Sequence, residues 1–235
     1  MKAIILAAGI GSRLALEDIP KPMYKIQGVP ILEHNILLLK KHNIKDICIN
    51  LYYKGKVIKK YFGDGSKWNV KITYSEEKEL LGTSGAIKNI EWFWTGDPFF
   101  VLYGDNYTDI DLNEMMSLHK AGKPIGTIAV FDPQKVANSQ IAGGFVKTDK
   151  NNNIISFIEG NKTNERGYVN AGVYVLEPGI LDMIPPGKSS DFGKDIFPKV
   201  IESRHILKAY LTKSFVIAID TKEALEHTEK ITRRQ

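Results

Sequence analysis

Two glycines and two cationic side chains lie close together near the start of the sequence. Gly9 and Gly11 follow a short apolar run, and Arg13 comes two residues later. Lys21 lies between two prolines in the polar segment that follows. Glycine lets the backbone approach a ligand closely, and the N–H groups of such a turn can face an anion. Because arginine and lysine both pair with phosphates, these residues together suit a polyphosphate.

The turn does not follow either of the two common phosphate-binding patterns. It is not the Gly-x-Gly-x-x-Gly turn of dinucleotide-binding domains, and it is not the Gly-x4-Gly-Lys-Ser/Thr loop. An ordinary strand-to-helix turn, with Arg13 and Lys21 at the surface, is the alternative interpretation.

Two aspartates, Asp105 and Asp220, each follow an apolar run that is typical of a buried strand. Carboxylate oxygens are the ligands that hard divalent cations prefer. Aspartates at the ends of two strands can meet across the crevice of a sheet, so we expect them to hold Mg²⁺ together. Each has a structural alternative, because aspartate is also a common loop residue and helix N-cap.

Apolar periodicity predicts the strands and helices that would position these groups. Strands are expected over residues 3–7, 46–51, 70–75, 99–103, 125–131, 169–176 and 215–219. Helices are expected over residues 30–42, 54–62, 82–94, 112–120, 195–202 and 221–232. Residues 144–148 and 154–158 flank an asparagine-rich turn and predict a β-hairpin. The alternation of strands and helices predicts a parallel α/β sheet that binds its ligand beyond the carboxyl ends of the strands.

The composition fits one soluble α/β domain. The chain has 235 residues, of which 43% are hydrophobic, and a net charge of +5. Its lysines alternate with acids, so we assign the excess charge to solvated surface and a polyphosphate site, with no nucleic-acid partner. Cys48 is the only cysteine and lies in an apolar run, which favours a core residue over a nucleophile. With no leader and no membrane span, we expect a cytoplasmic protein without an appended domain.

The glycine turn and the proline-flanked lysine resemble a known signature. Residues 6–14 read Leu-Ala-Ala-Gly-Ile-Gly-Ser-Arg-Leu, and residues 20–23 read Pro-Lys-Pro-Met. They are similar to the signature of the sugar-1-phosphate nucleotidyltransferases, the nucleoside-diphosphate-sugar pyrophosphorylases, and most closely to the heptose- and mannose-1-phosphate guanylyltransferases. The resemblance covers nearly the whole chain. It implies one nucleotidyltransferase domain over residues 1–235, with a Rossmann-like, mostly parallel sheet flanked by helices and a small hairpin excursion near residues 140–160.

A second glycine-rich stretch, residues 77–86, resembles the family segment that packs around the base and the sugar. It reads Glu-Lys-Glu-Leu-Leu-Gly-Thr-Ser-Gly-Ala, with Leu80 where the family has proline. Its small residues would let the backbone approach a flat ring, and an ordinary helix start is the alternative. We expect Glu77 to read the base edge. A carboxylate only accepts hydrogen bonds, so it favours the amino groups of guanine or cytosine, and hence GTP or CTP.

Two later segments resemble the part of the family that holds the acceptor. Asn170 and Gly172 match an Asn-x-Gly segment whose asparagine contacts the sugar. Glu159 matches the glutamate of a Phe-x-Glu-Lys segment, but the lysine that holds the acceptor's phosphate is replaced by Gly160. Lys162 or Arg166 could serve in its place.

The resemblance implies a role for each matching residue. Arg13 and Lys21 are expected to be catalytic, and Asp105 and Asp220 to hold Mg²⁺. The residues expected to bind the nucleotide are Leu6, Ala7, Ala8, Gly9, Gly11, Ser12, Arg13, Glu77, Gly82 and Thr83. Those expected to bind the acceptor are Asp105, Gly144, Glu159, Lys162, Asn170 and Gly172.

The implied reaction moves a nucleoside monophosphate from an NTP to a sugar 1-phosphate and releases pyrophosphate. The product would be a precursor of surface polysaccharide, and a homodimer is expected. Two alternatives stay open. One is a cytidylyltransferase acting on a non-sugar phosphate, such as phosphocholine or a phosphorylated amino acid, which Gly160 favours. The other is a regulatory subunit that binds nucleotide without turnover.

Overall fold

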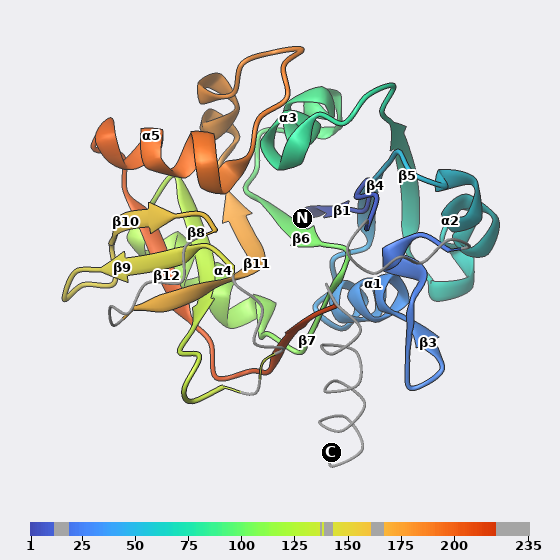
Figure 1. Ribbon diagram of the computed structural model, residues 1–235, viewed down its shortest axis with the longest axis horizontal. Coiled ribbons are helices and arrows are strands. Elements are labelled where there is room, and N and C mark those ends of the chain that lie inside the picture. The colour runs from blue at the N-terminus through green and yellow to red at the C-terminus, as the bar shows by residue number, and fades with distance from the viewer. Residues whose placement is uncertain (12–18, 137, 139–142, 161–166, 220–235) are drawn as a thin grey trace.

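Nine strands form one mixed sheet in the described part of the chain, which is residues 1–11, 19–136, 138, 143–160 and 167–219 of the computed structural model (Figure 1). The strands of this sheet are β1 (Lys2–Leu6), β4 (Asp46–Leu51), β5 (Lys71–Glu76), β6 (Phe99–Tyr103), β8 (Gly126–Phe131), β9 (Phe145–Thr148), β10 (Ile154–Ile158), β11 (Tyr168–Leu176) and β12 (Leu207–Leu211). The α-helices are α1 (Ile31–Lys41), α2 (Gly55–Phe62), α3 (Gly82–Asn89), α4 (Leu112–Gly122) and α5 (Phe197–Glu202).

Shorter elements complete the described chain. Two small antiparallel sheets pair β2 (Lys25–Ile26) with β3 (Val29–Pro30), and β7 (Asn106–Thr108) with β13 (Val216–Ala218). Short 3-10 helices cover Lys21–Met23, Ser66–Trp68, Glu91–Phe93 and Pro178–Met183, and a π-helical turn, Phe192–Ile196, leads into α5.

The centre of the main sheet is parallel, as the sequence predicts. Strands β6, β1, β4 and β5 lie side by side in that order, and each neighbouring pair is parallel. Beyond β6 the sheet becomes mixed, because β11 pairs antiparallel with both β6 and β8. The strand order reverses at β1, since β4 and β5 lie on one side of it and β6 lies on the other. Ligands of α/β sheets bind beyond the carboxyl ends of the strands at such a point.

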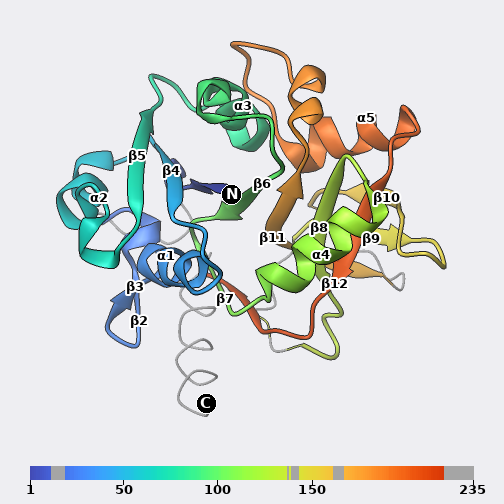
Figure 2. The same ribbon diagram turned by 180° about the vertical axis from the view of Figure 1, so that it is seen from behind.

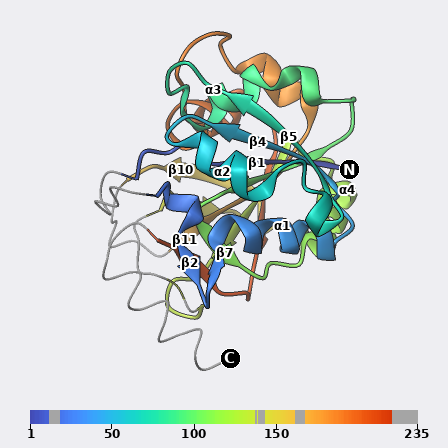
Figure 3. The same ribbon diagram turned by 90° about the vertical axis from the view of Figure 1, so that its right-hand side faces the viewer.

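Helices pack against both faces of the sheet and enclose two apolar cores. One core includes side chains of α1, α2 and α4, and the other includes side chains of α3 and α5. Figure 3 shows α1 and α3 on opposite sides of the central strands, and Figure 2 shows the face that carries α1 and α4. Along β1, Ile4 faces one core and Ile5 the other, as the period of two residues in a strand requires.

Cys48 lies fully buried in β4, in agreement with the expectation of a core residue. Burial raises the pKa of its thiol to about 12, which keeps it protonated and unreactive at neutral pH. None of the helices in the described ranges is long and apolar enough to cross a membrane.

The structure differs from the sequence-based elements in several places. The helix expected over residues 82–94 ends at Asn89, and a 3-10 turn follows it. The expected hairpin is present as β9 and β10, but β9 also pairs with β11, so the hairpin extends the main sheet. The strand expected over 215–219 pairs with β7 in a separate small sheet. Strands β2, β3, β7 and β12 were not predicted, and the helix expected over 221–232 lies outside the described residues.

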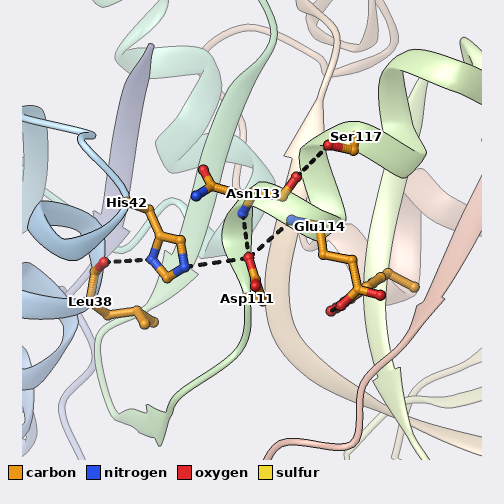
Figure 4. Close-up of polar contacts among 7 residues, drawn as sticks. Leu38, His42, Asp111, Asn113, Glu114 and Ser117 are labelled. Carbon is orange, nitrogen blue, oxygen red and sulfur yellow. Dashed lines mark hydrogen bonds and ion pairs between the residues drawn. The ribbon is translucent and has the colours of Figure 1, made fainter.

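A polar contact joins the end of α1 to the start of α4 (Figure 4). His42 follows α1, and its Nδ1 lies 2.9 Å from the carbonyl oxygen of Leu38. Its Nε2 lies 3.5 Å from Oδ1 of Asp111, the N-cap of α4. The same oxygen accepts hydrogen bonds from the N–H groups of Asn113 and Glu114, at 2.9 and 3.0 Å. The contact connects the helix that follows β3 to the one that follows β7.

Replacing Asp111 should therefore weaken this connection. Asp111→Ala removes the cap of α4 and the contact with His42, so we expect the free energy of unfolding to fall by about 1 kcal/mol, measured by denaturant titration. The control is Asp109→Ala at an exposed position before the helix, which should change stability by less than about 0.5 kcal/mol. Equal stability of the two variants would contradict the role of Asp111.

Candidate active site

A pocket of about 340 Å³ lies at the carboxyl ends of β1 and β6, where the strand order reverses. The chain after β1 and the chain after β6 line one part of it, and the start of α3 lines another. The sequence-predicted residues that line this pocket are Leu6, Ala7, Ala8, Gly9, Lys21, Glu77, Gly82, Thr83 and Asp105. The structure thus brings together residues from three separate segments of the sequence.

The glycine turn packs directly on the segment that carries Lys21. Gly11 has a φ of +67°, and a Cβ on it would lie 3.2 Å from Cβ of Lys21. Lys21 begins a 3-10 helix with prolines on both sides, which restricts its backbone, and the N–H of Met23 donates to the carbonyl of Pro20. Lys21 is only 7% exposed, so its cationic side chain is held at the wall of the pocket.

Lys21 forms an ion pair with Asp105, and both side chains line the pocket. Asp105 follows β6, and the end of β6 is held against β1 by a hydrogen bond of 2.9 Å from the N–H of Gly104 to the carbonyl of Leu6. A Cβ at Gly104 would approach that carbonyl oxygen to 2.8 Å, so glycine is needed for this close contact. A buried ammonium requires an anionic partner, which Asp105 supplies.

Asn50, which the sequence analysis did not identify, lies beside these residues in the pocket. Its Oδ1 accepts a hydrogen bond of 2.6 Å from the N–H of Ala7, and its Nδ2 donates to Oε1 of Glu77 at 2.7 Å. The one signal in the sequence is a polar amide in the otherwise apolar run Ile-Cys-Ile-Asn-Leu.

Glu77 is buried at the wall of the pocket and is 9% exposed. Besides the bond from Asn50, its Oε2 accepts a hydrogen bond of 3.1 Å from the N–H of Leu81. Burial raises the pKa of Glu77, while these two donors lower it in part. The carboxyl group is therefore held in a fixed orientation by the chain itself.

The glycines of the second glycine-rich stretch make room for another part of the chain. Gly82 has a φ of +71°, and a Cβ on it would collide with the carbonyl oxygen of Ser190. A Cβ on Gly85 would lie 2.7 Å from the carbonyl oxygen of Lys188. We expected these small residues to admit a flat ring. In the structure, the space that side chains would fill is occupied by residues 188–190.

Thr83 connects the start of α3 to the π-helical turn. Its N–H and hydroxyl lie 3.1 and 3.2 Å from Oδ1 of Asp191 and donate to it. The hydroxyl oxygen in turn accepts a bond of 2.9 Å from the N–H of Phe192. Thr83 therefore lines the pocket while its polar atoms hold the segment that leads into α5.

Among the described residues expected to hold the acceptor, Asp105 lines this pocket, and the other four lie outside its lining. Glu159 packs against Gly144, and a Cβ on Gly193 would collide with its Oε2. Desolvation and the negative charge of Asp191 raise the pKa of Glu159. Glu159 and Gly144 thus lie beside the π-helical turn that Thr83 holds.

Asn170 and Gly172 lie on the neighbouring strand β11. The amide of Asn170 donates to the hydroxyl of Tyr174 at 2.8 Å, and its Oδ1 accepts from the N–H of Gly172 at 3.0 Å. Gly172 has a φ of +69°, and a Cβ on it would collide with the amide of Asn106. Tyr103 links this group to the pocket, because it lines the pocket and its ring centroid lies 5.6 Å from that of Tyr174.

Ser12, Arg13, Lys162, Arg166 and Asp220 lie outside the described residues. Within the described ranges, no group of three or more His, Cys, Asp or Glu side chains is arranged to hold a metal ion. Of the two aspartates expected to hold Mg²⁺, the structure therefore places Asp105 alone.

Comparison with known proteins identifies a family for most of the chain. The family model described as "Nucleotidyl transferase" matches residues 2–216. The chain is 37% identical over 219 residues to a UTP–glucose-1-phosphate uridylyltransferase of Synechocystis, covering 86% of this chain and 56% of the relative. The chain thus spans little more than half the length of that relative.

Two further similar proteins match a larger share of their own length. The D-glycero-alpha-D-manno-heptose 1-phosphate guanylyltransferase of Campylobacter jejuni is 39% identical over 184 residues, covering 77% of this chain and 78% of that one. The crystal structure of HddC from Yersinia pseudotuberculosis, complexed with GMP-PN, superposes with a TM-score of 0.81 at 28% identity. That match covers 98% of this chain and 99% of the other.

A glycine substitution tests the close packing at the start of α3. Gly82→Ala should lower the free energy of unfolding by about 2 kcal/mol or more, because the new Cβ collides with backbone. Gly187→Ala is the matched control, since Gly187 has a similar φ of +65° but open space around it, and should cost only about 1 kcal/mol. Chemical denaturation of both variants gives the comparison, and a smaller loss for Gly82→Ala would contradict the packing.

Proposed function

The chain belongs to the nucleotidyl transferase family, and we propose that it transfers a nucleoside monophosphate from an NTP to a sugar 1-phosphate, releasing pyrophosphate. The observation that carries this proposal is the pocket at the carboxyl ends of β1 and β6, where the glycine turn lies beside the Lys21–Asp105 pair. The named relatives act on sugar 1-phosphates, which supports the same acceptor class for this chain.

In the proposed reaction, a phosphate oxygen of the acceptor attacks the α-phosphorus of the NTP, and pyrophosphate leaves. Such a transfer needs little covalent chemistry from the protein, so positioning and charge neutralisation supply the catalysis. The N–H groups of the turn from Ala8 to Gly11, which follows the N–H of Ala7 held by Asn50, would face the triphosphate. Lys21 would bridge the α-phosphate and the attacking phosphate, and Arg13, by resemblance to the family, would neutralise charge on the leaving pyrophosphate.

Asp105 suits a divalent cation at this site. It offers carboxylate oxygens on the pocket wall, with its side chain 29% exposed, and oxygen is the ligand type that Mg²⁺ prefers. Asp220 is proposed as the second ligand. When bound, Mg²⁺ would neutralise the phosphates as a Lewis acid. Because Asp105 pairs with Lys21 in the structure, the two groups would separate as phosphates take Lys21 and the cation takes Asp105.

For the base, we propose that Glu77 favours GTP, with CTP as the second choice. Both oxygens of Glu77 already accept one hydrogen bond from the chain, and each retains a lone pair for a ligand. Guanine offers two adjacent donors, N1–H and the N2 amino group, that match two acceptor oxygens. Uracil offers carbonyl groups on both sides of its single N–H and matches them less well.

For the acceptor, we propose a sugar 1-phosphate of the mannose or heptose type, held by Asn170, Gly172, Glu159, Gly144 and Asp105. Lys162 would bind its phosphate in place of the lysine that the family has at the position of Gly160. A non-sugar phosphate with CTP is the second candidate. It is favoured because the lysine that the family uses to hold the acceptor's phosphate is missing at Gly160. This glycine has a φ of +78° and open space around it.

Some expectations about the setting of the protein stay predictions. They are a homodimer, a cytoplasmic location, and a role in making precursors of surface polysaccharide. Light scattering of the purified protein measures the first of these directly.

The proposed reaction is tested by pyrophosphate release with Mg²⁺, four NTPs and a panel of acceptors. The acceptors are hexose and heptose 1-phosphates, phosphocholine and phosphorylated amino acids. We expect turnover with GTP and a mannose-type 1-phosphate. Turnover only with CTP and a non-sugar phosphate would support the second candidate. Nucleotide binding without turnover on any acceptor would contradict a transferase and favour a regulatory role.

Lys21→Ala should lower turnover by about 10²–10³-fold, because it removes a preorganised cation from the reacting phosphates. Lys25→Ala, at an exposed lysine four residues later, is the control and should keep the parent rate. Thermal unfolding of both variants shows whether the fold is intact. A rate near that of the parent in folded Lys21→Ala would exclude Lys21 from the proposed chemistry.

A further inference from the structure

The side-chain amide of Asn50 joins the ends of three neighbouring strands. Asn50 lies near the carboxyl end of β4, which pairs with β1 on one side and β5 on the other. Its Oδ1 accepts from the N–H of Ala7, just after β1, and its Nδ2 donates to Glu77, just after β5. Asn50 is 2% exposed, so both hydrogen bonds are shielded from bulk water and strengthened by the low local dielectric.

The two partners determine which way round this amide lies. A backbone N–H only donates, so the atom facing Ala7 must be the amide oxygen. An ionised carboxylate only accepts, so the atom facing Glu77 must be the amide nitrogen. Turning the amide over would place two donors together at one end and two acceptors at the other. An ionised aspartate of the same size could accept from Ala7 but could not donate to Glu77.

Glu77 is consequently held from two sides. Asn50 donates to Oε1 and the N–H of Leu81 donates to Oε2, at 2.7 and 3.1 Å. These donors stabilise the ionised form, against the effect of burial, and leave one lone pair on each oxygen. Ala7, Asn50 and Glu77 all line the same pocket. The hydrogen bonds from Ala7 to Asn50 and from Asn50 to Glu77, called the relay below, therefore connect the turn beside Lys21 to the carboxylate that would face the base.

Resting on the function proposed above, we propose that Asn50 is a positioning residue that couples the phosphate-binding turn to the base-reading carboxylate and thereby sets the base preference. Through Ala7 it fixes the start of the turn whose N–H groups would face the triphosphate. Through Glu77 it keeps a carboxylate edge on the pocket wall that only accepts hydrogen bonds. Such an edge suits a base with adjacent N–H donors, as in guanine, and disfavours a base that presents carbonyl groups there, as in uracil.

Two substitutions separate the two ends of the relay. Asn50→Asp keeps the acceptor for Ala7 but faces Glu77 with a second carboxyl group, and such a pair retains a proton. A proton shared between the two carboxyl groups reduces the negative charge of Glu77 and weakens it as an acceptor for the base, so we expect the ratio of kcat/KM for GTP to kcat/KM for UTP to fall by about tenfold or more. Asn50→Leu removes both hydrogen bonds, so kcat should also fall with both nucleotides.

Matched variants show whether the effect is specific. Asn35→Asp makes the same substitution at an equally buried asparagine of α1 that does not line the pocket, and it should keep the parent ratio. Glu77→Gln introduces an N–H donor at the proposed base-reading position, so it should shift the ratio in the same direction as Asn50→Asp. Dissociation constants for GTP and UTP, measured by titration calorimetry, give the same ratio without turnover.

The outcomes distinguish this inference from the proposed function. If Glu77→Gln shifts the ratio but Asn50→Asp does not, the role of Asn50 is overturned while the proposed function stands. Equal losses for GTP and UTP in Asn50→Asp would show a merely structural role and would also overturn it. If the parent releases no pyrophosphate with any acceptor, the proposed function fails, and the ratio of dissociation constants still decides the role of Asn50.

Discussion

A lysine ammonium that is removed from water needs an anion beside it, and in this protein Lys21 has Asp105. The two residues come from distant parts of the chain, so the backbone around each must be held closely. Gly11 lets the turn after β1 pack on Lys21, and Gly104 lets the end of β6 contact the end of β1. In the proposed reaction the charges of Lys21 and Asp105 neutralise each other until the substrates bind. Phosphates would then pair with Lys21, and a divalent cation would pair with Asp105.

The remaining features of the site surround that pair and depend on the mixed sheet. The parallel strands place the glycine turn, Asn50 and Glu77 along one edge, where the base and the triphosphate would lie. The antiparallel strand β11 places Asn170 next to this edge, beyond Tyr103. The residues proposed to hold the nucleotide and those proposed to hold the acceptor are thus connected through the ring contact between Tyr103 and Tyr174. This arrangement suits a reaction that joins two phosphorylated molecules.

The parts of the fold that the sequence predicted well are those with strong local patterns. Strands β4 and β6 begin and end at the expected residues, because apolar side chains dominate each short run. The pocket residues after β1 follow from the glycines and cations near the start of the chain. Asn50 and the packing of Gly82 on Ser190 were not predicted, because their partners are distant in sequence. Short strands such as β7 and β12 carry too few residues for a pattern and form through their neighbours.

The most direct test of the account follows the oxygen atoms through the reaction. The protein would be incubated with GTP, Mg²⁺ and mannose 1-phosphate in which the non-bridging phosphate oxygens carry ¹⁸O. Mass spectrometry would then measure how many ¹⁸O atoms each product contains. Attack by the acceptor's phosphate on the α-phosphorus predicts that all of the label stays in a nucleoside-diphosphate sugar and that pyrophosphate carries none. Labelled inorganic phosphate without a joined product would instead indicate hydrolysis and would contradict nucleotidyl transfer.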